Sequence, residues 1–192
     1  MLISPGNRNE SPEHYELKQI AKYLLWSRGC KMIATEVYGF YGNIMDFPDR
    51  RFSDKNIIDT VGVDFKQLRN KTPRIKLIGM EAKVSLSDFR NGFCTACELT
   101  YIIAPAGIVP PEELPDGIGL IEVDLGKYQI SRVGDTIGGI QTTVQARNRL
   151  CSRFENKESY MKWAFKQVPR IAYRVTAVDL FKKPEIFIPE QP

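Results

Sequence analysis

The stretch from Arg74 to Val84, which reads RIKLIGMEAKV, decides the fold of this chain, because an aliphatic run ends in the order Glu-x-Lys. Its length and apolar content predict a β-strand. Strand side chains alternate between two faces, so Glu81 and Lys83 are expected to project together, and Met80 and Ala82 from the other face. The end of a rigid strand would thus present an acid and an amine side by side.

A second acid, Asp59, lies upstream in the segment 55–65, which also reads as a strand. Asp64 in the same segment is the rival acid, and we favour Asp59. On neighbouring strands, Asp59 and Glu81 would offer carboxylate oxygens, which are the ligands of hard cations such as Mg²⁺ and Mn²⁺. Lys83 would then position or polarise a water molecule against a phosphodiester.

Hydrophobic periodicity, helix caps and turn residues predict the order of elements around these two strands. A Ser11 cap followed by Pro12 starts a helix that runs to about Ser27. The further predicted elements are a strand at 32–41, a helix from Ser85 to about Ala96, a strand at 98–104, a short helix at 110–114, and a strand at 118–124 with 128–131 as its hairpin partner. This order predicts an α/β fold with a central mixed sheet flanked by helices.

The composition changes after residue 134, and from about Thr142 the chain is predicted to be helical and basic. We therefore expect a core at 1–133 and a helical basic extension at 134–192 packed on it. Two interpretations of the extension stay open. Arg147, Arg149 and Arg153 would contact DNA, or the interleaved aromatic residues would pack against the sheet with the basic residues facing solvent. The extension is also where a homodimer or protein partner would bind.

Composition narrows the class of protein. The chain has 192 residues and a net charge of +4, which permits nucleic-acid binding without requiring it. It contains no apolar run long enough to span a membrane, and its first residues lack the order of a signal peptide. We therefore expect a cytoplasmic protein without membrane contact.

Cysteine and histidine content disfavours several kinds of site. The four cysteines include Cys94-Thr-Ala-Cys97, which falls in a predicted helix without a second pair, so packed free thiols are expected. His14 is the only histidine, which leaves the chain poorly equipped for a zinc site or a Ser-His-Asp triad. A redox protein or small-molecule hydrolase using Cys94 and Cys97 is therefore the weakest interpretation.

The motif in this setting resembles the PD-(D/E)XK nuclease superfamily, and the stretch 36–130 is more narrowly similar to the MmcB family of DNA-repair-associated nucleases. The residues that carry the resemblance are Thr35-Glu36, Asp59, the run MEAKVSLSDF from Met80 to Phe89, Pro105, and the run LPDGIGLI from Leu114 to Ile121. Ile58 stands where proline is common in the superfamily. Pro48-Asp49 spells the motif literally but lies in a polar stretch, not on a strand.

The resemblance implies a restriction-endonuclease-like core that hydrolyses phosphodiester bonds in DNA with Mg²⁺ or Mn²⁺, in DNA repair or in the biology of a phage or mobile element. It implies Asp59 and Glu81 as metal ligands and Lys83 as the catalytic lysine. A further acid would come from the first helix, as Glu16 or Glu13, or from Glu36 on the first strand. The alternative is a nucleic-acid-binding module of the same fold without turnover.

Overall fold

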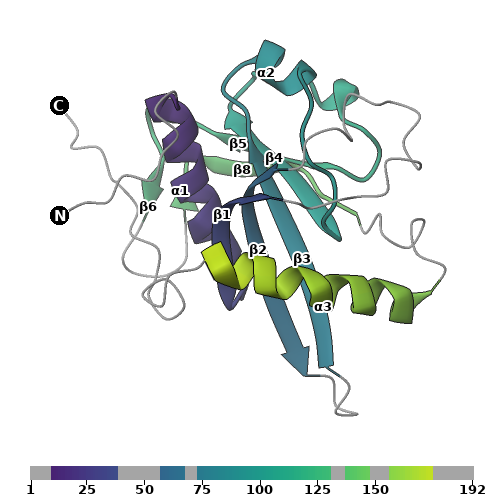
Figure 1. The fold of residues 1–192 in the computed structure, drawn as a ribbon. Helices are drawn as coiled ribbons and strands as arrows, with labels where there is room; N and C mark the ends of the chain where they lie inside the picture. The colour runs from purple at the N-terminus through teal and green to yellow at the C-terminus, as the bar shows by residue number, and fades with distance from the viewer. Residues whose placement is uncertain (1–9, 39–56, 68–72, 131–136, 148–155, 175–192) are drawn as a thin grey trace.

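The computed structural model describes residues 10–38, 57–67, 73–130, 137–147 and 156–174. Among these residues, six strands form a mixed sheet in the order β1-β2-β3-β4-β5-β8, and β6 pairs with β7 beside it (Figure 1). The strands are β1 Met32–Tyr38, β2 Ile57–Gln67, β3 Pro73–Ala82, β4 Leu99–Pro105, β5 Gly119–Val123, β6 Gln129–Ile130, β7 Ile137–Gly138 and β8 Ile140–Val144. The helices are α1 Pro12–Ser27, α2 Leu86–Arg90, the 3₁₀ turn η3 Pro111–Glu113 and α3 Lys157–Arg174.

Helix α1 begins where the sequence predicts. The Ser11 hydroxyl accepts a hydrogen bond from the backbone N–H of His14 at 3.2 Å, and Pro12 occupies the first helical position. The helix ends at Ser27, and Gly29 follows with a φ of +88°, a conformation that glycine adopts without strain. One face of α1 is buried, through Leu17, Lys18, Ile20, Ala21, Tyr23 and Leu25.

The pairing of the strands confirms the predicted meander and crossover. Strands β1, β2 and β3 are antiparallel neighbours, and β3 continues through α2 to β4, which lies parallel to it. Strand β5 is parallel to β4, and β8 closes that side of the sheet antiparallel to β5. Strand β3 thus lies in the interior of the sheet, and Glu81 at its end pairs with β4.

Three sequence predictions are wrong in detail. Helix α2 stops at Arg90 instead of about Ala96, because Gly92 turns the chain with a φ of +92°. Residues 128–130 do not pair with β5, since Lys127 and Tyr128 bond back to the carbonyl of Asp124 and β6 pairs with β7, and residue 131 lies outside the described residues. The helix predicted from about Thr142 is a strand as far as Val144. Its alternating half-buried residues complete the sheet of the predicted core, so the observed helix of the extension is α3.

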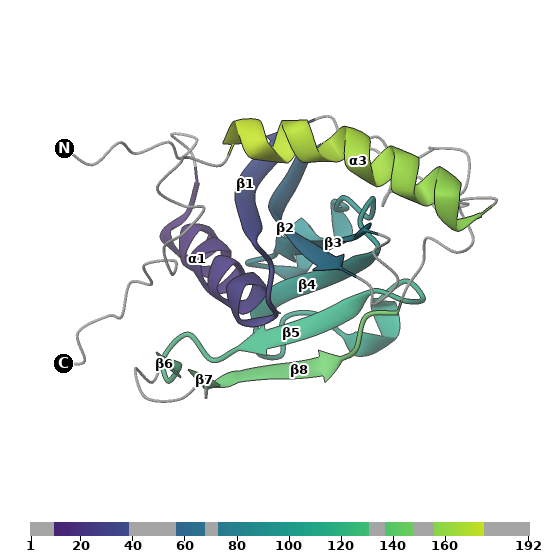
Figure 2. The same cartoon turned by 90° about the horizontal axis from the view of Figure 1, so that it is seen from below.

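Helices cover both faces of the sheet (Figure 2). On one face, α1 packs on a cluster that includes Ile78, Met80 and Ile103. On the other face, Tyr160, Ala164 and Ile171 of α3 pack on a cluster that includes Val61, Ile75 and Leu77. The α3 residues recur at helical spacing, so one face of this helix is buried against the sheet. None of the helices in the described ranges has the length and apolar character needed to cross a membrane.

Candidate functional site

The predicted site lies where the sheet forks. Strand β2 stays paired with β1 as far as Ile57, but its register with β3 ends at the pair Thr60–Met80. Strand β3 runs on to Ala82, whose backbone N–H donates to Asp59 Oδ2 at 3.0 Å. Where β2 no longer pairs with β3 through its backbone, the Asp59 carboxylate of β2 therefore accepts the hydrogen bond of β3. The structure thus brings the carboxylate of Asp59 to the backbone N–H of Ala82, the residue between Glu81 and Lys83.

An irregularity in β1 sets the direction of the acids at this fork. Glu36 has a φ of 52°, and it is the one non-glycine residue of the described chain with a positive φ. In a regular strand, residues three positions apart lie on opposite faces. Ala34 and Val37 nevertheless both belong to the cluster under α3, so the alternation reverses at Glu36.

The side-chain alternation of the neighbouring strand, β2, reverses at the same level. Ile58 and Val61 of β2 both lie in the cluster under α3, although they too are three positions apart. A Cβ placed on Gly79 of β3 would come within 2.6 Å of Ile58 Cδ1, so Ile58 packs over β3 on that face. The two reversals turn the side chains of Glu36 and Asp59 toward α1.

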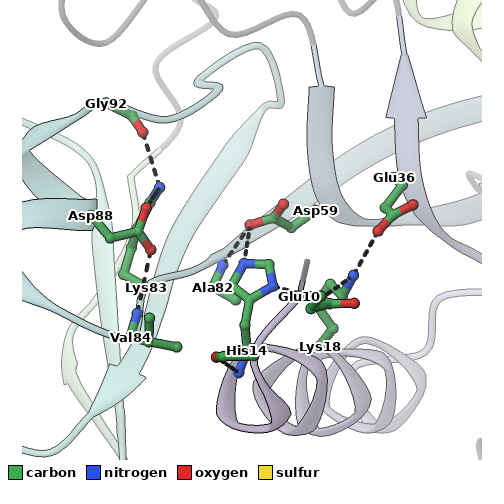
Figure 3. Close-up of polar contacts among 11 residues, drawn as sticks. Glu10, His14, Lys18, Glu36, Asp59, Ala82, Lys83, Val84, Asp88 and Gly92 are labelled. Atoms are coloured by element: carbon green, nitrogen blue, oxygen red, sulfur yellow. Dashed lines mark hydrogen bonds and ion pairs between the residues drawn. The ribbon is translucent and has the colours of Figure 1, made fainter. Parts of the chain in front are cut away.

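A chain of charged side chains links these two acids through α1 (Figure 3). His14 Nε2 lies 3.5 Å from Asp59 Oδ2, and His14 Nδ1 lies 2.5 Å from Glu10 Oε1. Lys18 Nζ lies 2.5 Å from the same Glu10 oxygen and 2.8 Å from Glu36 Oε1. Glu10 and Lys18 are almost fully buried, whereas His14, Glu36 and Asp59 are about one-fifth exposed. Each acid in the chain thus faces a base.

The pKa values at the site follow from this pairing. Burial raises the pKa of Asp59, but the hydrogen bond and charge of His14, the charge of Lys83 and the N–H of Ala82 outweigh burial and hold that pKa below its usual range. The hydrogen bond to Asp59 is the largest effect on His14 and, with Glu10, raises its pKa against the effect of burial. Burial lowers the pKa of Lys18, but Glu10 and Glu36 raise it further. The arrangement therefore favours an ionised Asp59 beside a protonated His14.

Lys83 lies on the other side of Asp59 from Glu36 (Figure 3). Its side chain is 2 % exposed, and its Nζ donates to the carbonyl of Gly92 at 3.0 Å and to Asp88 Oδ1 at 3.4 Å. Since Lys83 contributes to the lowered pKa of Asp59, the ammonium acts on that carboxylate through space. The predicted amine and the predicted acid are thus in electrostatic contact without a direct bond.

Glu81 points away from α1. Met80, Ala82 and Val84 belong to the cluster under α1, so alternation places Glu81 and Lys83 together on the opposite face, as the sequence predicts. The residue beside Glu81 on β4 is Ile102, which packs with Phe89 and Phe93 on that same face. Glu81 is 1 % exposed. Asp59 and Glu81 therefore leave the fork on opposite faces of the sheet.

This arrangement does not fit one metal ion held by both acids. Their oxygens have the right chemistry for Mg²⁺ or Mn²⁺. However, Asp59 is bonded to Ala82 and His14 on the α1 side, while Glu81 projects from the other face. In the ranges that the structure describes, no three His, Cys, Asp or Glu side chains gather as metal ligands.

Of the other predicted acids, one belongs to the chain of charged side chains and two do not. Glu16 accepts a 2.5 Å hydrogen bond from the hydroxyl of Tyr128 and takes no part in the chain of charges, and Glu13 is exposed. Glu36 lies in the chain of charges. Sequence reasoning missed Glu10 and the role of His14. The spacing of His14 and Lys18 by four positions was the available signal, since such residues share one face of a helix, whereas Glu10 precedes the Ser11 cap.

The basic residues predicted to contact DNA are only partly described. Arg147 is 80 % exposed at the end of β8, with its Nη1 3.9 Å from Asp116 Oδ1. Arg149 and Arg153 lie outside the described residues. Among the cysteines, Cys94 and Cys97 form no disulfide and are buried in the cluster under α3, which confirms the prediction of packed thiols and weakens the redox interpretation.

Comparison of the chain with models of protein families, with curated proteins and with solved structures found no match.

Proposed function

We propose that this chain is a nuclease of the PD-(D/E)XK type, with a restriction-endonuclease-like core that hydrolyses phosphodiester bonds in DNA. The observation that carries the proposal is the hydrogen bond from Ala82 N–H to Asp59 Oδ2. It joins the acid of one strand to the peptide between the acid and the lysine of the next. The order of helix, three-strand meander, crossover helix and parallel strand supports the same fold.

The side chains supply two features that such chemistry needs. The lowered pKa of Asp59 keeps an anionic oxygen at the fork at neutral pH. Lys83 supplies a cation that suits the developing charge on a phosphate. Mg²⁺ or Mn²⁺ is part of the proposal as cofactor, because a divalent ion lowers the pKa of bound water and offsets phosphate charge. The arrangement described above does not hold one ion between Asp59 and Glu81, and joint binding would require one of these acids to turn to the other face of the sheet.

The test is a cleavage assay on single-stranded, duplex and branched DNA, with chelator and after addition of Mg²⁺ or Mn²⁺. We expect activity that vanishes in chelator and returns with either ion. Asp59→Asn and Glu81→Gln should weaken metal binding measured by calorimetry, because each removes an anionic ligand. Lys83→Ala should spare metal binding and reduce turnover. The exposed Glu112→Gln is the matched control. Full cleavage by the Lys83 variant would remove the lysine from the mechanism.

A second candidate is a nucleic-acid-binding module of the same fold without turnover. It is favoured by the opposite projection of Asp59 and Glu81. This candidate predicts DNA binding that persists in chelator, no cleavage with either ion, and the same affinity for Asp59→Asn as for the parent chain. Metal-dependent cleavage would exclude it.

A further inference from the structure

The contacts of Lys83 single out a residue on the crossover behind it. Asp88 lies in α2, five positions after Lys83, and its Oδ1 is 3.4 Å from Lys83 Nζ. The carbonyl of Gly92 accepts a 3.0 Å bond from the same ammonium. Both acceptors belong to the short segment 88–92 that follows β3. This segment therefore holds the ammonium of Lys83 on the face of the sheet opposite α1. We call these two contacts the grip on Lys83.

Asp88 is bonded separately through its backbone and through its side chain. The Ser85 hydroxyl accepts a hydrogen bond from the backbone N–H of Asp88 at 3.1 Å, which caps α2. Asp88 Oδ2 lies 3.4 Å from the N–H of Val84, the residue after Lys83. One carboxylate thus spans the ammonium of Lys83 and the next peptide. Gly92 then ends the turn with a φ of +92°, which explains why α2 has only five residues.

Lys83 has fewer acceptors in the described residues than its ammonium has donors. A lysine ammonium has three N–H donors, and burying a donor without a partner costs free energy. Within the described part of the chain, Lys83 Nζ has two acceptors, Gly92 O and Asp88 Oδ1, although its side chain is 2 % exposed. One donor therefore remains for an acceptor outside these residues, and a phosphate oxygen is an acceptor of that kind.

We propose that Asp88 is a positioning residue for Lys83. With the Gly92 carbonyl, it fixes the ammonium at the fork so that the remaining donor meets the phosphate of DNA. The effect of Asp88 on catalysis rests on the proposed nuclease function, whereas its hold on Lys83 does not. The exposed pair of Arg90 with Glu113 on the neighbouring face of the same segment is not part of it.

The experiment separates the grip from the stability of α2. Asp88→Asn keeps the shape of the side chain and removes its charge. Ser85→Ala removes the cap of α2 and leaves the charge beside Lys83. The acetylation rate of Lys83 is measured by mass spectrometry after limited acetic anhydride labelling, relative to Lys127, which is 83 % exposed. We expect Asp88→Asn to raise the relative rate about threefold to tenfold, and Ser85→Ala to lower the melting temperature while leaving that rate near its original value.

The kinetic arm uses the same variants on DNA. Asp88→Asn should lower kcat about threefold to tenfold with KM nearly unchanged, and Asp88→Glu should recover part of that activity because it restores the charge. An unchanged labelling rate in Asp88→Asn, or an equal effect of Ser85→Ala, would overturn the grip. Faster labelling with unchanged kcat would overturn the positioning role. If the parent chain cleaves no DNA, the nuclease proposal fails, and labelling alone decides whether Asp88 holds Lys83.

Discussion

The backbone of Glu36 is the most costly feature of the site at the scale of a residue. A left-handed conformation at a non-glycine residue costs about 1–2 kcal/mol, because Cβ approaches the following carbonyl oxygen. Strain of this kind persists where its surroundings determine it, and it concentrates at functional sites. Here it reverses β1 so that Glu36 meets Lys18 at 2.8 Å. The strain is therefore linked to the direction in which the acids of the fork point.

Replacing Glu36 separates the strain from the side chain. Glu36→Ala and Glu36→Gly both remove the carboxylate that pairs with Lys18, but only glycine adopts a φ of 52° without strain. We expect the glycine variant to be more stable than the alanine variant by about 1 kcal/mol in urea unfolding. At a regular strand position the order would be reversed, since glycine there is the less stable choice. An alanine variant that equals or exceeds the glycine variant would contradict the strain.

His14 makes a pH-dependent contribution to stability. Its pKa in the folded protein is raised above 6.5, so the stabilisation is fully present below that unfolded value and is lost as pH rises through the folded pKa. At pH 6 the parent chain should exceed His14→Gln in unfolding free energy by about 1 kcal/mol more than it does at pH 9. Taking the difference between the two proteins removes the contributions of the other titrating groups, which both proteins share. Equal differences at both pH values would show that the imidazolium does not pair in the folded state.

At the scale of an element, the sequence predicts best where local signals agree. The Ser11 cap and Pro12 place the start of α1, and the aliphatic runs place β2, β3 and β4. The prediction makes α2 too long because the residues after Arg90 are compatible with a helix. In the structure, the turn at Gly92 ends the helix. Strand β8 escapes prediction because its basic neighbours favour a helix, although Ile140, Thr142 and Val144 alternate.

The site shows why strand alternation alone is not enough. Alternation correctly places Glu81 and Lys83 on one face, because β3 is regular there. It cannot place Asp59, because the alternation of β2 also reverses, beside the positive φ of Glu36 on β1, and the residue types give no sign of either reversal. His14 joins the site through tertiary contact with Asp59 of β2, and Glu10 joins it through His14 and Lys18. Candidate residues are thus predictable from the sequence, but their directions are not.

Helix α3 offers a test of packing at the same scale. Ile171 is fully buried in the cluster under α3, whereas Phe165 on the same helix is 47 % exposed. Ile171→Ala should lower the free energy of unfolding by about 2–4 kcal/mol, because it leaves a cavity, and Phe165→Ala by roughly 0.5 kcal/mol or less. Urea unfolding of both variants measures the difference. Equal decreases would mean that α3 does not pack by this face.

For the whole molecule, the architecture places two sets of exposed basic residues on different parts of the sheet. Helices cover both faces of the sheet, and the fork lies among β1, β2 and β3, while Arg147 follows β8 at the other side of the sheet (Figure 1). The lysines Lys157, Lys162 and Lys166 form a second basic set, exposed on α3. DNA that reaches the fork would therefore meet one of two basic surfaces, and the two can be tested against each other.

Salt dependence distinguishes these two surfaces. If Arg147, Arg149 and Arg153 bind phosphates, replacing all three by glutamine should lower the log–log salt slope of duplex binding by about 0.9 for each phosphate that is no longer neutralised. The matched triple variant of Lys157, Lys162 and Lys166 should then leave the slope unchanged. Fluorescence anisotropy over a salt series measures both slopes. A slope that falls only in the lysine variant would assign DNA binding to α3 instead.

The bond between Ala82 N–H and Asp59 Oδ2 also has a spectroscopic consequence. Elsewhere in a sheet, an amide proton reports the backbone partner across the ladder, and it changes only when the strands part. The Ala82 proton instead reports a side chain, so one cross-peak in an ¹H–¹⁵N spectrum should follow the state of Asp59. Titration with Mg²⁺, Mn²⁺ or an oligonucleotide could thus be followed at the fork from that single signal, whether or not any phosphodiester is cleaved.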